Sequence, residues 1–91
     1  MENEKIKNID YSRKFLKSLE KLPKKIIELT KNKEKIFKQN PFDSQLKTHK
    51  LSGKEKVCWS FWIDYHYRIK FIFLSDEKVL FLDIGTHSIY I

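Results

Sequence analysis

The stretch VCWSFWIDYHYRIKFIFLSDEKVLFLDI, residues 57–84, decides the fold class of this chain. Apolar and polar side chains alternate along most of it with a period of two, which is typical of half-buried β-strands. Two short polar segments, Asp64-Tyr65-His66 and Ser75-Asp76-Glu77, interrupt the alternation and have the composition of tight turns. We therefore expect three strands in succession, each joined to the next by a hairpin turn.

The middle one of these strands is expected to have one apolar and one basic face. Successive side chains of a strand point to opposite sides of the sheet, so Arg68 and Lys70 share the face opposite the apolar one. The apolar face is formed by Tyr67, Ile69, Phe71 and Phe73. By the same alternation Trp59 and Trp62 lie on opposite faces, so one belongs to the core and the other covers the sheet edge or is exposed for stacking.

The chain before residue 44 has the periodicity of helices. Ser12 can cap a first helix, whose apolar side chains recur at helical spacing as Phe15, Leu16, Leu19 and Leu22. Pro23 ends that helix and suits the first turn of a second one. The second helix ends at Asn40-Pro41, because the residue before a proline is displaced from the α-helical region. The result is a helical hairpin.

Two further segments are candidate strands, Lys5–Asp10 before the helices and Gln45–Leu51 after them. Strands joined by short turns form an antiparallel meander, and a helical hairpin inserted after the first strand packs on a single face of the sheet. The predicted fold class is therefore α+β, a single domain over residues 1–91 with an antiparallel β-sheet meander and an N-terminal helical hairpin packed on one face. The other face of the sheet is left free.

Length and composition exclude several classes of protein. With 91 residues and 41% hydrophobic side chains, the chain is one domain with enough apolar surface for a core, not a multidomain enzyme or a disordered tail. Cys58 is the only cysteine, which excludes an intrachain disulfide and a cysteine-based zinc site. The apolar runs are too short for a signal peptide or a membrane span, so we expect a cytoplasmic protein with no membrane partner.

The charge of the chain is unevenly distributed. Lys and Arg number 19 against 12 Asp and Glu, a net charge of +7; residues 1–56 carry 16 against 8, hence +8, and residues 57–91 carry 3 against 4, hence −1. A basic surface favours nucleic acid, an acidic protein or an anionic surface as partner. Because 17 of the basic residues are Lys, with 11 Ile and no Ala in the chain, AT-rich codon usage explains part of the basicity.

The segment KTHKLSGK, residues 47–54, concentrates a titratable group and cations on one strand and its turn. It contains His49 together with Lys47, Lys50 and Lys54. Such a group can bind and act on a phosphate. A surface strand with an incidental histidine is the competing and slightly simpler interpretation.

Arg68 is the second candidate, because the chain contains only two arginines. A guanidinium holds a phosphate in a two-pronged fashion that lysine cannot match, and Lys70 lies on the same side of the strand. The alternative is a structural ion pair between Arg68 and a neighbouring acid such as Asp64 or Asp83.

His87 and Tyr90 follow the last predicted strand. Histidine serves as a general acid or base near neutral pH, and tyrosine can stack on a base or orient a phosphate. Histidines, an arginine and lysines without paired carboxylates do not resemble a metal site, so neither a metal nor another cofactor is expected. They resemble a metal-free ribonuclease set, with one base for the 2′-hydroxyl, one acid for the leaving oxygen and cations for the charged phosphorus.

Several short motifs follow one another along nearly the whole chain, from about Tyr11 to Tyr90. They are LPKK (22–25), NPF (40–42), LKTHKLSGK (46–54), WSF (59–61), YHYRIKF (65–71) and LDIGTHSIY (82–90). In this order they resemble the RelE/ParE superfamily of bacterial type II toxin–antitoxin toxins, nearest the YafQ/YoeB-like mRNA interferases. The combination is fairly specific, whereas each motif alone would be weak.

The resemblance implies a compact sheet with two packed N-terminal helices, in agreement with the periodicity. It also implies an endoribonuclease that cleaves mRNA in the ribosomal A site, leaves a 2′,3′-cyclic phosphate and a 5′-hydroxyl, and so inhibits translation. By motif match, His49 would be the general base, Arg68 would stabilise the scissile phosphate, His87 would be the general acid and Tyr90 would contact the substrate. Supporting phosphate contacts would come from Lys47, Lys50, Lys54 and Lys70.

The resemblance further implies a cognate antitoxin, which would cover the basic surface with an acidic, partly disordered segment. Operator DNA would be bound only through the antitoxin complex. Two positions depart from the YafQ pattern, because Asp83 replaces an arginine and Trp62 replaces a histidine. A ParE-like toxin that inhibits DNA gyrase without catalysis shares the fold and is the main alternative, and a basic module that binds RNA without cutting it is the third.

Overall fold

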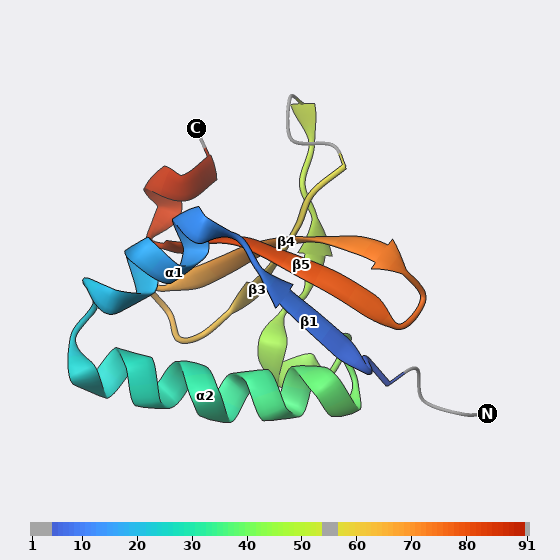
Figure 1. The fold of residues 1–91 in the computed structure, drawn as a ribbon, viewed down its shortest axis with the longest axis horizontal. Coiled ribbons are helices and arrows are strands. Elements are labelled where there is room, and N and C mark those ends of the chain that lie inside the picture. Colours follow the sequence, from blue (N-terminus) through green and yellow to red (C-terminus); the bar gives the residue numbers. More distant parts are fainter. Residues whose placement is uncertain (1–4, 54–56, 91) are drawn as a thin grey trace.

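A computed structural model of the chain describes residues 5–53 and 57–90, which form an α+β fold around one five-stranded sheet. The strands lie in the order β1-β5-β4-β3-β2 (Figure 1). In chain order the elements are β1 (Asn8–Tyr11), α1 (Arg13–Glu20), α2 (Lys24–Gln39), η1 (Ser44–Leu46), β2 (His49–Lys50), β3 (Trp59–Trp62), β4 (Arg68–Ser75), β5 (Lys78–Gly85) and η3 (His87–Tyr90), where η marks a 3-10 helix. The predicted fold class is confirmed.

The meander of β2, β3, β4 and β5 is antiparallel throughout, as predicted. The first strand differs, because β1 pairs with β5 in parallel, from Asn8 opposite Lys78 to Tyr11 opposite Phe81. The prediction of a purely antiparallel sheet was therefore wrong at this edge. The strand β1 gives β5 a hydrogen-bonded neighbour on the side away from β4, so that β5 is not left as an open edge.

The predicted strand over Gln45–Leu51 is also shorter than expected, because only His49 and Lys50 are in a strand. The residues before them form η1, where the Asp43 carboxylate accepts a hydrogen bond of 2.9 Å from the backbone N–H of Gln45. Lys47 then has a φ of 54°, in the left-handed region that no strand residue adopts. Local side-chain capping therefore overrides the alternating pattern in this segment.

The two helices begin and end close to the predicted residues. Ser12 caps α1 by accepting a hydrogen bond of 2.9 Å from the backbone N–H of Phe15, and its own hydroxyl donates to the carbonyl of Leu82 at 2.8 Å. One side chain thus caps α1 and attaches it to β5. Pro23 is the N-cap of α2, and α2 ends at Gln39, directly before Asn40-Pro41.

A hydrogen bond also connects β1 to α2, since the Tyr11 hydroxyl donates to the Glu34 carboxylate. Partial burial, together with this hydrogen bond and the negative charge of Glu34, raises the pKa of Tyr11 above its usual value. The phenol therefore stays protonated at neutral pH and keeps its role as donor.

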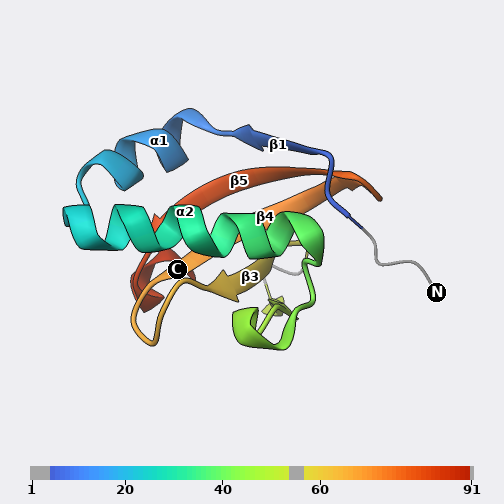
Figure 2. The same ribbon diagram turned by 90° about the horizontal axis from the view of Figure 1, so that it is seen from below.

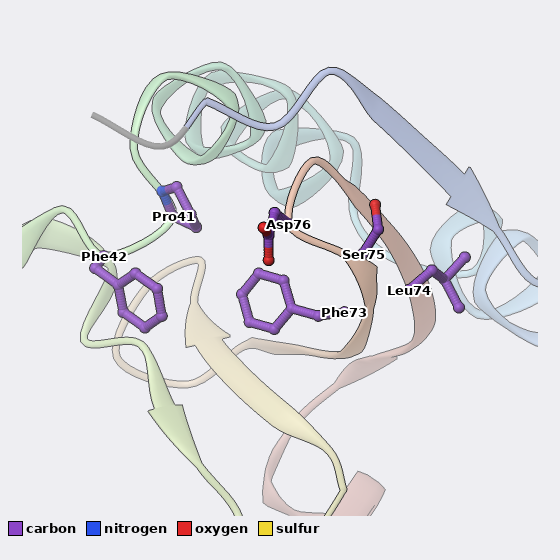
Figure 3. A pocket seen from close by; sticks show the side chains of 6 residues that line it. All are labelled: Pro41, Phe42, Phe73, Leu74, Ser75 and Asp76. Atoms are coloured by element: carbon purple, nitrogen blue, oxygen red, sulfur yellow. The ribbon is translucent and has the colours of Figure 1, made fainter. Parts of the chain in front are cut away.

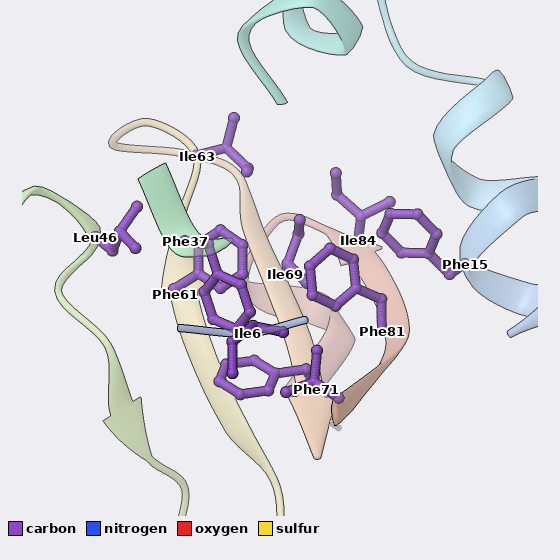
Figure 4. Close-up of a cluster of buried hydrophobic side chains, with 11 residues drawn as sticks. Ile6, Phe15, Phe37, Leu46, Phe61, Ile63, Ile69, Phe71, Phe81 and Ile84 are labelled. Atoms are coloured by element: carbon purple, nitrogen blue, oxygen red, sulfur yellow. The ribbon is translucent and has the colours of Figure 1, made fainter. Parts of the chain in front are cut away.

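The hydrophobic core lies between α2 and one face of the sheet (Figures 2 and 4). Phe37 of α2 is at its centre, and its ring stacks on Phe61 of β3 with the centroids 4.6 Å apart. The same ring meets the rings of Phe71 and Phe81 edge-on, at 5.0 and 5.6 Å. One helical side chain therefore joins three strands.

Replacing Phe37 with alanine is expected to reduce the free energy of unfolding by about 3–5 kcal/mol, because the side chain is fully buried and its neighbours cannot fill the cavity. Guanidinium unfolding followed by tryptophan fluorescence would measure the loss. Leu16→Ala is the control, because Leu16 on α1 is 50% exposed and should contribute far less. Equal losses for the two variants would contradict the central position of Phe37 in the core.

In the described part of the chain, the opposite face of the sheet has no covering α-helix, as predicted (Figure 1). In Figure 1, α2 runs below the sheet and η3 lies above it, at the end where β3 turns into β4. Lys70 of β4 donates a hydrogen bond of 3.0 Å to the carbonyl of Ile89, which holds η3 over this face. Within the described part of the chain, neither α1 nor α2 is long and apolar enough to cross a membrane.

Candidate functional site

A hollow of about 460 Å³ lies where the loop between β3 and β4 meets the segment that follows β5. Figures 1 and 2 both show that loop and η3 at the same end of the sheet. The hollow is lined by Trp62, Tyr65, His66, Arg68, Thr86 and His87. It therefore brings together a guanidinium, two imidazoles and two further aromatic rings.

Arg68 forms the floor of this hollow and is 7% exposed. Its Nη1 donates hydrogen bonds to the backbone carbonyls of Asp64 and Tyr65, at 2.9 and 2.8 Å. Its Cζ lies 4.1 Å from the centroid of the Trp62 ring, in cation–π geometry. The guanidinium is thus held in one orientation, and its partly desolvated charge attracts an anion more strongly than a solvated lysine would.

The predicted turn at Asp64-Tyr65-His66 is confirmed, and the Asp64 side chain stabilises it. One carboxylate oxygen of Asp64 accepts hydrogen bonds from the backbone N–H groups of His66, at 2.8 Å, and Tyr67, at 2.7 Å. The Tyr65 ring meets the Trp62 ring edge-on at 6.0 Å and the His66 ring at 5.2 Å. Because Tyr65 is 73% exposed, one wall of the hollow is an accessible aromatic surface.

Asp83 and Trp62, the two residues that depart from the YafQ pattern, both contact other side chains in the structure. The buried Asp83 carboxylate accepts a hydrogen bond of 2.8 Å from the Ser18 hydroxyl and forms an ion pair with Lys14 at 3.5 Å, so it attaches α1 to β5. Trp62 is the surface on which the guanidinium of Arg68 lies. The alternative interpretation of Arg68 was an ion pair with Asp64 or Asp83. Arg68 instead donates to the backbone carbonyl of Asp64, while the Asp64 carboxylate accepts from the turn and the Asp83 carboxylate pairs with Ser18 and Lys14.

Two of the predicted catalytic residues, Arg68 and His87, line the same hollow. His49 lies elsewhere, exposed on β2, with its Nδ1 2.9 Å from the carbonyl oxygen of Lys47. In the sheet register His49 is opposite Ser60, which places it on the same face as Trp62 but nearer the outer edge. Figures 1 and 2 show β2 well apart from η3.

The predicted substrate-binding residues do not all lie on this face of the sheet. Lys47 and Lys50 are exposed beside His49, but Lys50 is opposite Trp59 in the register and so lies on the face away from His49 and Trp62. Lys70 is half-buried and bonded to Ile89, as described above. Lys54 lies outside the described residues, and Tyr90 is the last residue of η3.

Sequence reasoning missed His66, Tyr65 and the position of Trp62 beneath Arg68. His66 and Tyr65 were interpreted only as turn residues. Their proximity in sequence to Arg68 could have indicated them, because the side chains of a hairpin turn lie at the same end of the sheet as the first residue of the strand that follows. Within the described part of the chain, no three His, Cys, Asp or Glu side chains gather closely enough to hold a metal ion.

A second and larger hollow, of about 530 Å³, lies at the other end of β4 (Figure 3). It is lined by Pro41, Phe42, Phe73, Leu74, Ser75 and Asp76. The rings of Phe42 and Phe73 stack with centroids 6.2 Å apart, and Asp76 is the one ionisable side chain of this lining. The described lining of the larger hollow therefore offers no pair of groups for acid–base chemistry, and the smaller hollow is the candidate site.

Comparison with known proteins places the fold among bacterial toxins. No protein-family model matches the chain, and no curated protein matches its sequence. Among solved structures, it is similar to YafQ from E. coli, with a TM-score of 0.75 and 21% identity over 90% of this chain and 94% of that one. The YoeB/ParE toxin from Agrobacterium tumefaciens gives a TM-score of 0.75 and 16% identity over 89% and 99%.

The toxin–antitoxin complex RelBE2 from Mycobacterium tuberculosis contains a chain with a TM-score of 0.78 and 13% identity over 97% of this chain and 99% of that one. Each of the three similarities extends over nearly the full length of both compared chains, so it concerns the whole fold and not one motif. This chain therefore has the toxin fold of YafQ, YoeB/ParE and the RelBE2 complex, which confirms at the level of tertiary structure the resemblance predicted from the sequence.

Proposed function

We propose that this protein is the toxin of a type II toxin–antitoxin pair and acts as a metal-independent endoribonuclease on mRNA bound to the ribosome. The observation that carries the proposal is the hollow that contains both Arg68 and His87, walled by aromatic rings, on the sheet face that no α-helix covers. A fixed cation beside an imidazole is what phosphodiester cleavage without a metal requires.

In the proposed reaction the 2′-oxygen of the nucleotide before the cleavage site attacks the adjacent phosphorus. A general base takes the 2′-hydroxyl proton, and the P–O5′ bond breaks as the new O2′–P bond forms. Arg68 stabilises the extra negative charge on the phosphoryl oxygens, and His87 gives its proton to the departing 5′-oxygen. The products are a 2′,3′-cyclic phosphate and a 5′-hydroxyl.

The side chains around the hollow support RNA as the substrate. The exposed ring of Tyr65 can stack on an unpaired base, which is the usual way in which proteins hold single-stranded RNA. Lys47 and Lys50 are exposed at the outer edge of the sheet, around β2, and would contact phosphates farther along the RNA, with Lys54 and Tyr90 as further contacts expected from the sequence. Lys70 would act through η3, because its Nζ is bonded to Ile89.

A cognate antitoxin is the expected protein partner. The solved structures with this fold include the DinJ–YafQ toxin–antitoxin complex of E. coli, at 21% identity and a TM-score of 0.71. The +8 charge of residues 1–56 would attract an acidic antitoxin segment, and operator DNA would be bound only through that complex. Binding of such a segment over the uncovered face would block access of mRNA to Arg68 and His87.

Primer extension on mRNA, after brief induction of the protein in bacterial cells, tests the proposal. Discrete in-frame cuts with the wild-type protein, and none with His87→Ala, would support it. Growth arrest with intact mRNA and induction of DNA-damage signalling would contradict it and favour inhibition of gyrase. Absence of both cleavage and growth arrest would also contradict it.

Alanine at Gly85 is expected to impair cleavage without unfolding the protein. A Cβ at this position would lie 2.7 Å from Cγ2 of Ile89, so the Ile89 side chain must move, and we expect η3, with His87 at its start, to be displaced with it. We expect a loss of at least about tenfold in the cleavage rate, because small displacements of a catalytic group are costly. The measurement is the single-turnover rate on ribosomes. Full activity would contradict the expected displacement of His87.

A further inference from the structure

We propose that His66 is the general base of this site and shares one phosphate with His87. The assignment rests on the ribonuclease function proposed above and adds to it a residue that the sequence suggested only as part of a turn. Its basis is the geometry of the hollow, in which the two imidazoles and the guanidinium of Arg68 are all lining groups.

A base and an acid for this reaction must open onto the same small space. The 2′-oxygen that loses a proton and the 5′-oxygen that gains one are bound to the same phosphorus in the transition state, on opposite sides. Each proton-transferring group must be within hydrogen-bond reach of its oxygen. Two imidazoles that line one hollow can satisfy this condition, with Arg68 on the floor between the strands.

The backbone at His66 is held from two sides. The Asp64 carboxylate accepts from the backbone N–H of His66 at 2.8 Å, and Nη1 of Arg68 donates to the carbonyls of Asp64 and Tyr65, which directly precede it. The Tyr65 ring meets the imidazole edge-on at 5.2 Å. The backbone that carries the imidazole is therefore fixed at the mouth of the hollow and needs little reorganisation before the reaction.

His49, the base expected from the sequence, lies differently. It belongs to the outermost strand, does not line the hollow, and has its Nδ1 at 2.9 Å from the carbonyl oxygen of Lys47. His66, in contrast, lines the hollow that contains His87.

The proposed step balances as follows. Nitrogen of neutral His66 takes the proton of the 2′-hydroxyl while the O2′–P bond forms. Protonated His87 gives its proton to the 5′-oxygen while the P–O5′ bond breaks. The site is left with His66 protonated and His87 neutral, and proton exchange with water restores both.

Single-turnover cleavage of mRNA on ribosomes tests the assignment. We expect His66→Ala and His66→Gln to lower the rate by at least about a hundredfold, which is the usual contribution of a general base. The decrease in cleavage rate should be at least about tenfold smaller for His49→Ala than for His66→Ala. Gln39→Ala, at the exposed end of α2, is the control for substitution of a large polar side chain outside the site. A larger loss for His49→Ala than for His66→Ala would overturn the assignment.

A substrate with sulfur in place of the bridging 5′-oxygen separates the two roles. A thiolate leaves without being protonated, because a thiol is a much stronger acid than an alcohol. The substrate should therefore restore cleavage by His87→Ala but not by His66→Ala. If the substrate restored cleavage only by His66→Ala, His66 would be the acid and His87 the base. If it restored cleavage by both variants, His66 would not be the base. A merely structural role of His66 would not produce the expected difference.

A binding measurement distinguishes failure of this assignment from failure of the function. In NMR, the imidazole C–H signals would be followed during titration with a trinucleotide that carries a 2′-O-methyl group and cannot be cut. His66 and His87 should shift together, with the same half-saturation. A shift of His87 without His66 would overturn the shared site. Joint shifts in a wild-type protein that cuts no mRNA would contradict the ribonuclease function while supporting the shared hollow.

Discussion

Alanine at Arg68 is expected to lower the single-turnover rate of mRNA cleavage on ribosomes by about 10²–10³-fold, the usual effect of removing one stabilising donor from a charged transition state. Among the described residues that line the hollow, Arg68 is the one lysine or arginine, and its hydrogen bonds and the Trp62 ring hold its guanidinium in place. Loss of this group removes both the charge and the support of the loop that precedes it.

Arg68→Lys separates these two contributions. Lysine retains the positive charge but cannot reproduce the paired hydrogen bonds to the carbonyls of Asp64 and Tyr65 or the planar contact with Trp62. We expect its rate to lie between those of the wild type and Arg68→Ala. If Arg68→Lys were as active as the wild type, the charge alone would be sufficient and the fixed orientation irrelevant.

Arg68→Ala should also be less stable, because two backbone carbonyls lose a charged donor. The expected decrease in the free energy of unfolding is about 1–3 kcal/mol. Guanidinium unfolding measures it, and the cleavage assay must be run at a temperature where the variant is folded. Retained antitoxin binding or an unchanged circular dichroism spectrum would confirm the folded state. Full cleavage by the folded variant would contradict the proposed role.

His87→Ala is expected to lower the cleavage rate by about 10²–10⁴-fold, the usual contribution of a general acid. The side chain is exposed, so the unfolding midpoint should stay close to that of the wild type. Added imidazole should restore part of the activity to His87→Ala, because the deleted side chain leaves space at the edge of the hollow.

His87→Gln is the matched variant for this experiment. Glutamine occupies the space of the imidazole and cannot transfer a proton at neutral pH, so added imidazole should restore little or nothing. Equal restoration of the two variants would indicate that free imidazole acts elsewhere. Undiminished cleavage by His87→Ala would contradict the assignment of His87 as the acid.

Much of the fold could be predicted because it depends on local patterns. Ser12 was predicted to cap α1 and does so. The helix α2 ends before Asn40-Pro41, because a proline displaces the residue before it from the α-helical region. The turn at Asp64 was predicted from composition and is formed by that side chain. The segment around Lys47 could not be predicted as well, because a capping carboxylate and a left-handed residue compete there with the alternating pattern.

The candidate site was predictable only in part, for a different reason. The sequence pattern placed Arg68 on the face opposite the core, and this is where the guanidinium lies, beside Trp62. It did not indicate that backbone carbonyls, and not an acidic side chain, would be its hydrogen-bond partners. Such contacts depend on how a loop folds back on the strand that follows it.

The sequence by itself determined the α+β class, the meander of three successive strands, the helical hairpin and the face on which Arg68 lies, because each follows from periodicity and from the turn and cap residues nearby. Only the tertiary structure decided that β1 pairs in parallel with β5 and that His66, not His49, shares a hollow with His87. These outcomes depend on strand order and register, which join residues far apart in the chain and leave no trace in a local pattern.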